Sequence, residues 1–179
     1  MNTVAELAYE LSSEQIAFFH LEGYLIVRNL LSPAEVDAIA SRFAALADGS
    51  QPAPAGKWER DVNAADPLSR FPRVMHPHRW DELSKKMLLH PKVKAVLTQL
   101  LRDEPVATQS MYYFKPPSSR GQALHQDNFY LQVEPQTCIA AWMAIFVAWK
   151  RRCSSVSSAQ GRGRFTSPEP SFFIASGKA

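Results

Sequence analysis

The sequence predicts an α+β fold in which an N-terminal layer of helices packs against a β-sheet. Segments with helical periodicity and clear start and stop signals dominate as far as Glu104. From Pro105 onward, segments rich in β-branched and aromatic residues follow one another, separated by prolines and polar breaks. The chain has 179 residues, which is enough for one domain with a sizeable core.

Two helices are expected within the first 49 residues. The first begins after Ser12, which has capping-box spacing to Gln15, and it ends at Gly23. The second begins after Ser32, an expected N-cap, and ends at Gly49. The segment YLIVRNLL between them predicts a short strand.

The rest of the chain up to residue 145 divides into loop, helix and strand. Residues 51–80 contain five prolines and predict a loop-rich region. DELSKKMLLH and PKVKAVLTQLLRD predict two helices separated at Pro91, and VATQSMYYFKPP, FYLQVEP and TCIAAWMAI predict strands. The apolar run from Ile139 to Trp149 is too short to cross a membrane, which takes roughly 20 residues, so it is expected to be a buried strand.

The composition excludes several classes of protein. Two cysteines provide no disulfide framework and fit a reducing compartment, and the N-terminus has no signal-peptide pattern, so a cytoplasmic protein is expected. The chain has no phosphate-binding glycine loop, no hydrolase-type nucleophile motif and no zinc-type cysteine spacing. Cys138 is expected to be a small buried apolar side chain.

Residues 146–179 differ from the rest of the chain. They hold six basic residues and one acidic residue, a net charge of +5, and seven serines. The basic residues are interleaved with serine and glycine without helical or aromatic order, so we expect neither nucleic-acid nor membrane binding. We interpret 146–179 as an atypical basic, serine-rich tail that is disordered or aberrant.

His125, Gln126 and Asp127 form the motif that carries the most chemistry. In an extended segment, residues two apart point to the same face, so His125 and Asp127 could reach one ion while Gln126 faces away. One carboxylate and two imidazoles make the facial triad that holds Fe(II) in many oxygenases. The spacing alone arises often by chance, and its meaning depends on the flanking sequence.

The flanking sequence SMYYFKPPSSRGQALHQDNFYLQVEPQTCIAAWMAI resembles the phytanoyl-CoA dioxygenase-like family of Fe(II)- and 2-oxoglutarate-dependent oxygenases. The N-terminal stretch SSEQIAFFHLEGYLIVRNLLSPAEV resembles the opening helix–strand–helix of the same family, and the likeness covers about residues 10–145. The resemblance implies a double-stranded β-helix (jelly roll) with helices packed on it. It also implies hydroxylation of a small or lipid-like molecule, with the oligomeric state left open.

The resemblance assigns residues to the site. Iron would be held by His125, Asp127 and a distal histidine. The cofactor-binding residues, which would line the pocket for 2-oxoglutarate, are Gln126, Trp142, Met111, Tyr113 and Lys115.

The chain departs from the family pattern after residue 145. None of its five histidines follows His125, and the distal histidine and arginine of the family are absent as a recognisable motif. We therefore expect 1–145 to form the helical layer and the first half of the jelly roll, so that the fold is partial and the iron site incomplete. The alternative is a non-catalytic remnant or binding module that keeps the partial fold.

His76 and His78 have the same spacing as a ligand pair on an extended segment. They lie in the proline-rich sequence VMHPHRW. Either could in principle substitute for the third iron ligand, but we interpret them as loop residues that form hydrogen bonds with nearby backbone or face the mouth of the site.

Overall fold

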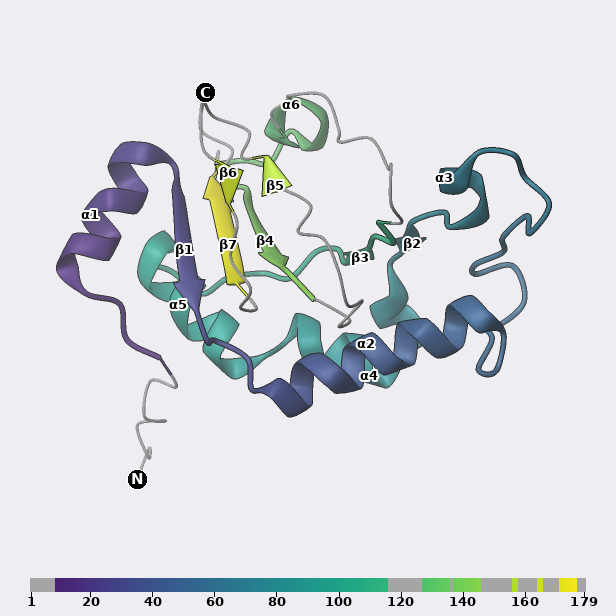
Figure 1. Cartoon of the computed structure of the whole chain (residues 1–179). Helices are drawn as coiled ribbons and strands as arrows, with labels where there is room; N and C mark the ends of the chain where they lie inside the picture. The colour runs from purple at the N-terminus through teal and green to yellow at the C-terminus, as the bar shows by residue number, and fades with distance from the viewer. Residues whose placement is uncertain are drawn as a thin grey trace. The chain divides into compact units, whose positions relative to one another are not determined.

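The computed structural model describes residues 9–115, 127–135 and 137–145, and the backbone of 156–157, 164–165 and 171–176 (Figure 1). The chain forms two compact units. The first contains Met1–Val36, Pro91–Pro105 and Ala123–Ala179, and the second contains Asp37–His90 and Val106–Gln122.

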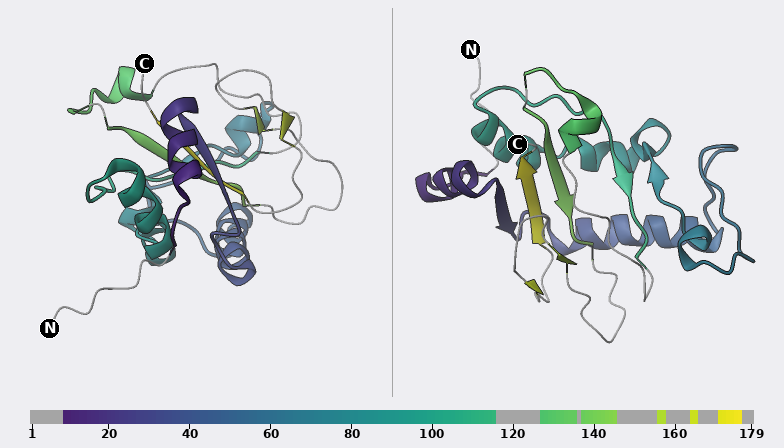
Figure 2. Two further views of the ribbon diagram at one scale, coloured as in Figure 1. Left: turned by 90° about the vertical axis from the view of Figure 1, so that its left-hand side faces the viewer. Right: turned by 90° about the horizontal axis from the view of Figure 1, so that it is seen from above.

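The first unit is built on a three-stranded antiparallel sheet. Strands β1 (Tyr24–Arg28) and β4 (Ile139–Met143) both pair with β7 (Ser171–Ser176), which lies between them (Figure 2). The remaining elements of this unit are α1 (Ser13–Glu22), α5 (Pro91–Leu101), α6 (Asp127–Leu131), β5 (Val156–Ser157) and β6 (Arg164–Phe165). The sequence predicted no strand after residue 149, yet β7 supplies the central strand of this sheet. The interpretation of 146–179 as a separate tail stays a prediction.

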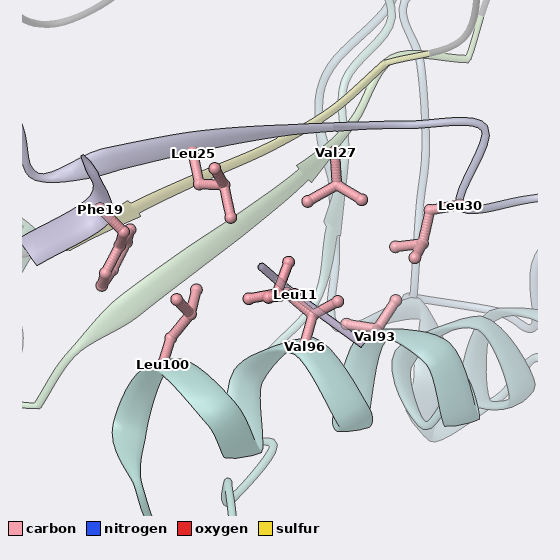
Figure 3. Close-up of a cluster of buried hydrophobic side chains, with 8 residues drawn as sticks. All are labelled: Leu11, Phe19, Leu25, Val27, Leu30, Val93, Val96 and Leu100. Carbon is pink, nitrogen blue, oxygen red and sulfur yellow. The ribbon is translucent and has the colours of Figure 1, made fainter. Parts of the chain in front are cut away.

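An aliphatic core joins this sheet to the helices. In Figure 3, side chains on α5, among them Val96 and Leu100, point toward Leu25 and Val27 of β1. The alternation of buried and half-buried residues along β1 follows from the period of two in a strand. The cluster consists of Leu11, Phe19, Leu25, Leu30, Val27, Val93, Val96 and Leu100, and Ile139 and Met143 of β4 pack against it.

The ends of α1 confirm the signals in the sequence. The Ser12 hydroxyl accepts a hydrogen bond from the Gln15 amide at 3.2 Å, and the Ser12 amide donates to the Gln15 side chain at 2.9 Å. Gly23 ends the helix with φ at 77°, a left-handed conformation that glycine adopts without steric cost. The predicted helix–strand boundary is therefore set by local chemistry.

The second unit combines a long helix with short elements. Helix α2 (Pro33–Asp48) enters this unit at Asp37, and its start has the predicted Ser32 cap, since Ser32 exchanges hydrogen bonds with Glu35. The other elements are α3 (Pro67–Arg70), β2 (Val74–Met75), the 3₁₀ turn η1 (Pro77–Arg79), α4 (Glu82–Leu88) and β3 (Met111–Tyr112). Strands β2 and β3 pair antiparallel, with Met75 opposite Met111.

The second unit combines buried aliphatic residues, among them Ile39, Leu46, Val74 and Met87, with a cluster of aromatic rings around Phe43. Phe43 of α2 stacks face to face on Tyr112, with ring centres 3.7 Å apart, and Phe114 meets both rings edge-on. Trp58 and Phe71 lie against Phe114, each at 5.7 Å between ring centres. Burial raises the pKa of Tyr112, which keeps its hydroxyl neutral.

A partly buried ion pair fixes α2 to the start of α4. The Arg42 guanidinium lies 2.6 Å from the Asp81 carboxylate, and it also donates to the Gln51 carbonyl at 2.9 Å. Asp81 is the N-cap of α4 and accepts hydrogen bonds from the backbone and hydroxyl of Ser84. Burial raises the pKa of Asp81, but the hydrogen bonds from Ser84 and Arg42 outweigh burial and hold the pKa below its usual value.

The α+β class is confirmed, since helices and strands both contribute and the helices dominate the first half of the chain. The described strands form one three-stranded and two two-stranded sheets, so the jelly roll stays a prediction. Within the described ranges, no helix is both long enough and apolar enough to cross a membrane.

Candidate functional site

Asp127, one of the two expected metal ligands, is the first residue of α6 and is half-buried. Asp127 lies near enough to Cys138 for its charge to affect the thiol. Cys138 is half-buried, whereas the sequence predicted a fully buried side chain. Burial raises the pKa of the Cys138 thiol, and the negative charge of Asp127 raises it further. The other expected ligand, His125, and the neighbouring Gln126 lie outside the described residues.

The predicted strand FYLQVEP is wrong, because residues 127–131 form helix α6. The Asn128 side chain accepts a hydrogen bond from the Val133 amide at 2.8 Å, and the Asn128 carbonyl accepts one from the Gln132 amide at 3.0 Å. Asparagine side chains compete in this way with strand pairing, and the contiguous Phe, Tyr and Leu lack the alternation of a half-buried strand. We expected His125 and Asp127 to point to the same face because we assumed an extended chain. The residues after Asp127 are helical, so this assumption does not hold for them.

Trp142, an expected pocket residue, lies on β4 and keeps 44% of its surface exposed. Ile139 and Met143 of the same strand pack on the aliphatic core. Because side chains alternate along a strand, Trp142 points to the opposite face of the sheet. The sequence predicted a buried strand from Ile139 to Trp149. Strand β4 ends at Met143 instead, and its residues Ala141 and Trp142 are exposed. Trp142 is therefore not a core residue, and its role in a pocket stays a prediction.

Met111, Tyr113 and Lys115 form a row in the second unit. The Tyr113 hydroxyl donates to the Met111 sulfur at 3.4 Å, and the Lys115 ammonium lies 5.8 Å from the centre of the Tyr113 ring. Tyr112 and Phe114, which alternate with them, belong to the aromatic core. The structure thus brings these three expected residues together on the side of the segment that the core leaves open.

His76 and His78 lie beside this row, a connection that the sequence analysis missed. Strand β2 pairs with β3, and the His76 amide donates to the Ser110 carbonyl at 2.8 Å. The Nδ1 atom of His78 lies 2.7 Å from the Ser110 hydroxyl, so its partner is a side chain of a distant segment and not the nearby backbone that the sequence predicted. A two-residue strand such as Val74–Met75 leaves too short a pattern to be detected in the sequence.

The pKa of His78 is lowered, first by burial and then by the positive charges of His76 and Arg79. His78 is therefore neutral at neutral pH, and a ring nitrogen can accept a proton or a metal ion. The Lys115 side chain, by contrast, is exposed and carries the positive charge that an anionic co-substrate would require.

The donor chemistry of the expected iron site fits in part. An imidazole and a carboxylate, from His125 and Asp127, are ligands that Fe(II) accepts. Among the described residues, however, no three His, Cys, Asp or Glu side chains come close enough together to hold a metal ion. The structure therefore gives the position of Asp127, at the start of α6. The assembly of the iron site stays a prediction.

Comparison with known proteins gives a consistent result. Residues 19–148 match the family model for phytanoyl-CoA dioxygenase (PhyH). The chain is 30% identical over 174 residues to "Phytanoyl-CoA dioxygenase 1" of Oryza sativa subsp. japonica, an alignment that covers 80% of this chain and 62% of the rice protein. It is 26% identical over 167 residues to "Phytanoyl-CoA dioxygenase" of Arabidopsis thaliana, with 75% and 59% covered. It is 25% identical over 174 residues to "Phytanoyl-CoA dioxygenase domain-containing protein 1" of Danio rerio, with 75% and 60% covered. The chain thus spans about three fifths of the length of these curated relatives.

Proposed function

Because this chain belongs to the phytanoyl-CoA dioxygenase (PhyH) family, we propose that it binds Fe(II) and 2-oxoglutarate as an oxygenase of a small or lipid-like molecule. One observation carries the proposal: the family match over residues 19–148 includes the motif His125-Gln126-Asp127. The names of the rice and Arabidopsis relatives support the same class of reaction. We also propose the jelly roll of the resemblance, in partial form, as the fold around the site.

Each site residue has a proposed task. His125 and Asp127 would hold the iron, and the chemistry supplied by iron and 2-oxoglutarate together would be hydroxylation of a substrate C–H bond. Trp142 would give the pocket an apolar wall that excludes water, with Gln126 beside the ligands. Met111, Tyr113 and Lys115 would contact the co-substrate, the Lys115 ammonium pairing with a carboxylate.

A second candidate is a non-catalytic module that retains the partial fold. It is favoured by the described residues, among which no three His, Cys, Asp or Glu side chains come together. In that case water would occupy a third ligand position, affinity for Fe(II) would be lower than that of a complete triad, and turnover would be slow or absent. We propose the division at residue 145 as the limit of the family-like part, in line with a family match that ends at residue 148.

Anaerobic titration with Fe(II) and 2-oxoglutarate separates the two candidates. An oxygenase site gives the weak visible charge-transfer band of iron-chelated 2-oxoglutarate, and Asp127→Ala or His125→Ala abolishes the band. His20→Gln is the matched control, because His20 is an exposed residue of α1. Absence of the band from the parent chain at saturating Fe(II) would reject the oxygenase proposal and leave the non-catalytic module.

Trp142→Ala tests the pocket assignment. Because Trp142 is almost half exposed, its removal should change the free energy of unfolding little, by less than about 1 kcal/mol. If Trp142 lines the pocket, the same variant should bind 2-oxoglutarate at least severalfold more weakly in the anaerobic titration. Unchanged binding of 2-oxoglutarate would remove Trp142 from the proposed site.

A further inference from the structure

His76 and His78 form a T-shaped pair of neighbouring imidazoles that the proposed iron site does not use. Their ring centres lie 5.8 Å apart, and the ring planes are nearly perpendicular at 85°. His76 follows β2 directly and His78 lies in η1, so both belong to the second unit. Both residues are half-buried.

The separation of the two rings suits one shared metal ion. With metal–nitrogen bonds of about 2.1 Å, the centres of two imidazoles on one ion lie roughly 4.5–6 Å apart, depending on the angle at the metal. The observed 5.8 Å falls within this range, at the wide-angle end.

Hydrogen bonding prepares the pair for this role. The His78 Nδ1 atom is held by the Ser110 hydroxyl at 2.7 Å, which orients the ring and leaves Nε2 for another partner. Metal-binding histidines are oriented by such a second hydrogen bond. The Nδ1 atom of His76 is buried and has no hydrogen-bond partner among the described residues, so its ring carries an unused nitrogen.

The backbone of His76 supports the same interpretation. Its φ is 49°, a left-handed conformation that is uncommon for residues other than glycine, although histidine, like asparagine and aspartate, adopts it more often than most. Such conformations gather at functional sites, where surrounding contacts hold them. Here the hydrogen bond from the His76 amide to the Ser110 carbonyl, at 2.8 Å, fixes the residue against the segment that also orients His78.

We propose that His76 and His78 together bind a divalent transition-metal ion of the Zn(II) or Cu(II) class, separate from the proposed iron site. Imidazole ligands favour these ions over Mg²⁺ and Ca²⁺, which prefer oxygen ligands. No third His, Cys, Asp or Glu completes a ligand group within the described part of the chain. Water fills the remaining positions, and the exposed positive charge of Arg79 opposes the ion, so the affinity is moderate.

Calorimetric titration with Zn(II) tests the pair in a chain carrying both His125→Ala and Asp127→Ala. The double substitution removes the proposed iron ligands, so failure of the iron site and failure of the histidine pair give separate results. We expect one Zn(II) site that weakens at least tenfold with His76→Asn and with His78→Gln. Asparagine at position 76 keeps the left-handed conformation accessible while removing the ring. His20→Gln should leave the affinity unchanged.

Two further measurements test the proposal in case the His76 or His78 variants fold poorly. In the parent chain, Zn(II) should raise the Tm, because the ion ties η1 to the end of β2, and both histidine variants should lose this shift. Added Co(II), which is paramagnetic, should broaden the imidazole NMR signals of His76 and His78 more than those of His20. Equal broadening of all three, or Zn(II) affinity independent of His76 and His78, would show a packing contact only and overturn the proposal.

Discussion

The two units of this chain are stabilised by different kinds of contact. The core of the first is aliphatic, with leucine and valine side chains of α5 facing β1. The second also buries aliphatic side chains, such as Ile39 and Val74, and it adds a directional aromatic cluster, with Phe43 stacked on Tyr112, and the Arg42–Asp81 ion pair. Aliphatic contacts gain stability in proportion to buried area, whereas stacked rings and ion pairs depend on orientation. We therefore expect the second unit to be the more sensitive to changes of shape.

The largest effect is expected from deletion of residues 146–179. The deletion removes β7, which pairs with both β1 and β4, and so separates the sheet of the first unit. Hydrogen exchange should then lose protection in β1 and β4, while α2 and α4 of the second unit keep theirs. Unchanged protection in β1 would instead support the interpretation of 146–179 as a disordered tail.

Phe43→Ala should destabilise the second unit by about 3–5 kcal/mol, because it removes a buried ring from the aromatic stack. Urea unfolding followed by tryptophan fluorescence measures this, since Trp58 and Trp80 both lie in the second unit. Phe129→Ala is the matched control. Phe129 is 76% exposed, so its loss should change the free energy of unfolding by less than about 0.5 kcal/mol.

Leu100→Ala should destabilise the first unit by about 2–5 kcal/mol, through lost burial and the cavity left beside β1. Hydrogen-exchange mass spectrometry should show the loss in α5 and β1. The control is Leu21→Ala, since Leu21 of α1 is 82% exposed. Equal losses of protection in α2 and α4 would show that the two units unfold together and are not stabilised separately.

Asp81→Asn should have the smallest effect, and the effect should depend on pH. Because the pKa of Asp81 is lowered in the folded protein, its ionised form stabilises the fold above the unfolded pKa, which is about 3.9. The free energy of unfolding of the parent should exceed that of the variant by roughly 1–3 kcal/mol at pH 7. This difference should shrink as the pH falls below about 4. Urea unfolding between pH 3 and 7 measures it, and a difference independent of pH would contradict the assigned role.

Local chemistry explains which elements could be predicted. The two long helices near the N-terminus carry their own start signals at Ser12 and Ser32, and both capping arrangements are present. The helices on either side of Pro91 and the strands β1 and β4 also follow from periodicity and composition. The strand predicted after Asp127 failed because Asn128 closes a single helical turn with its own side chain.

The residues assigned to the candidate site stay a prediction, and only part of their geometry could be anticipated from the sequence. The sequence identified the row of Met111, Tyr113 and Lys115, and the structure places these side chains in contact with one another. It gave no sign that β2 would bring His76 beside Ser110, because that pairing joins segments more than 30 residues apart. Long-range pairing depends on tertiary packing that no local pattern encodes.

The sequence by itself determined the family, the α+β class and the limits of the capped helices, because motifs and caps act over a few residues. Only the tertiary structure decided that β7 lies between β1 and β4, that Trp142 faces away from the core, and that two histidine rings form a T-shaped pair. These features arise from contacts between distant segments, whose free energy depends on the burial and pairing of the whole unit.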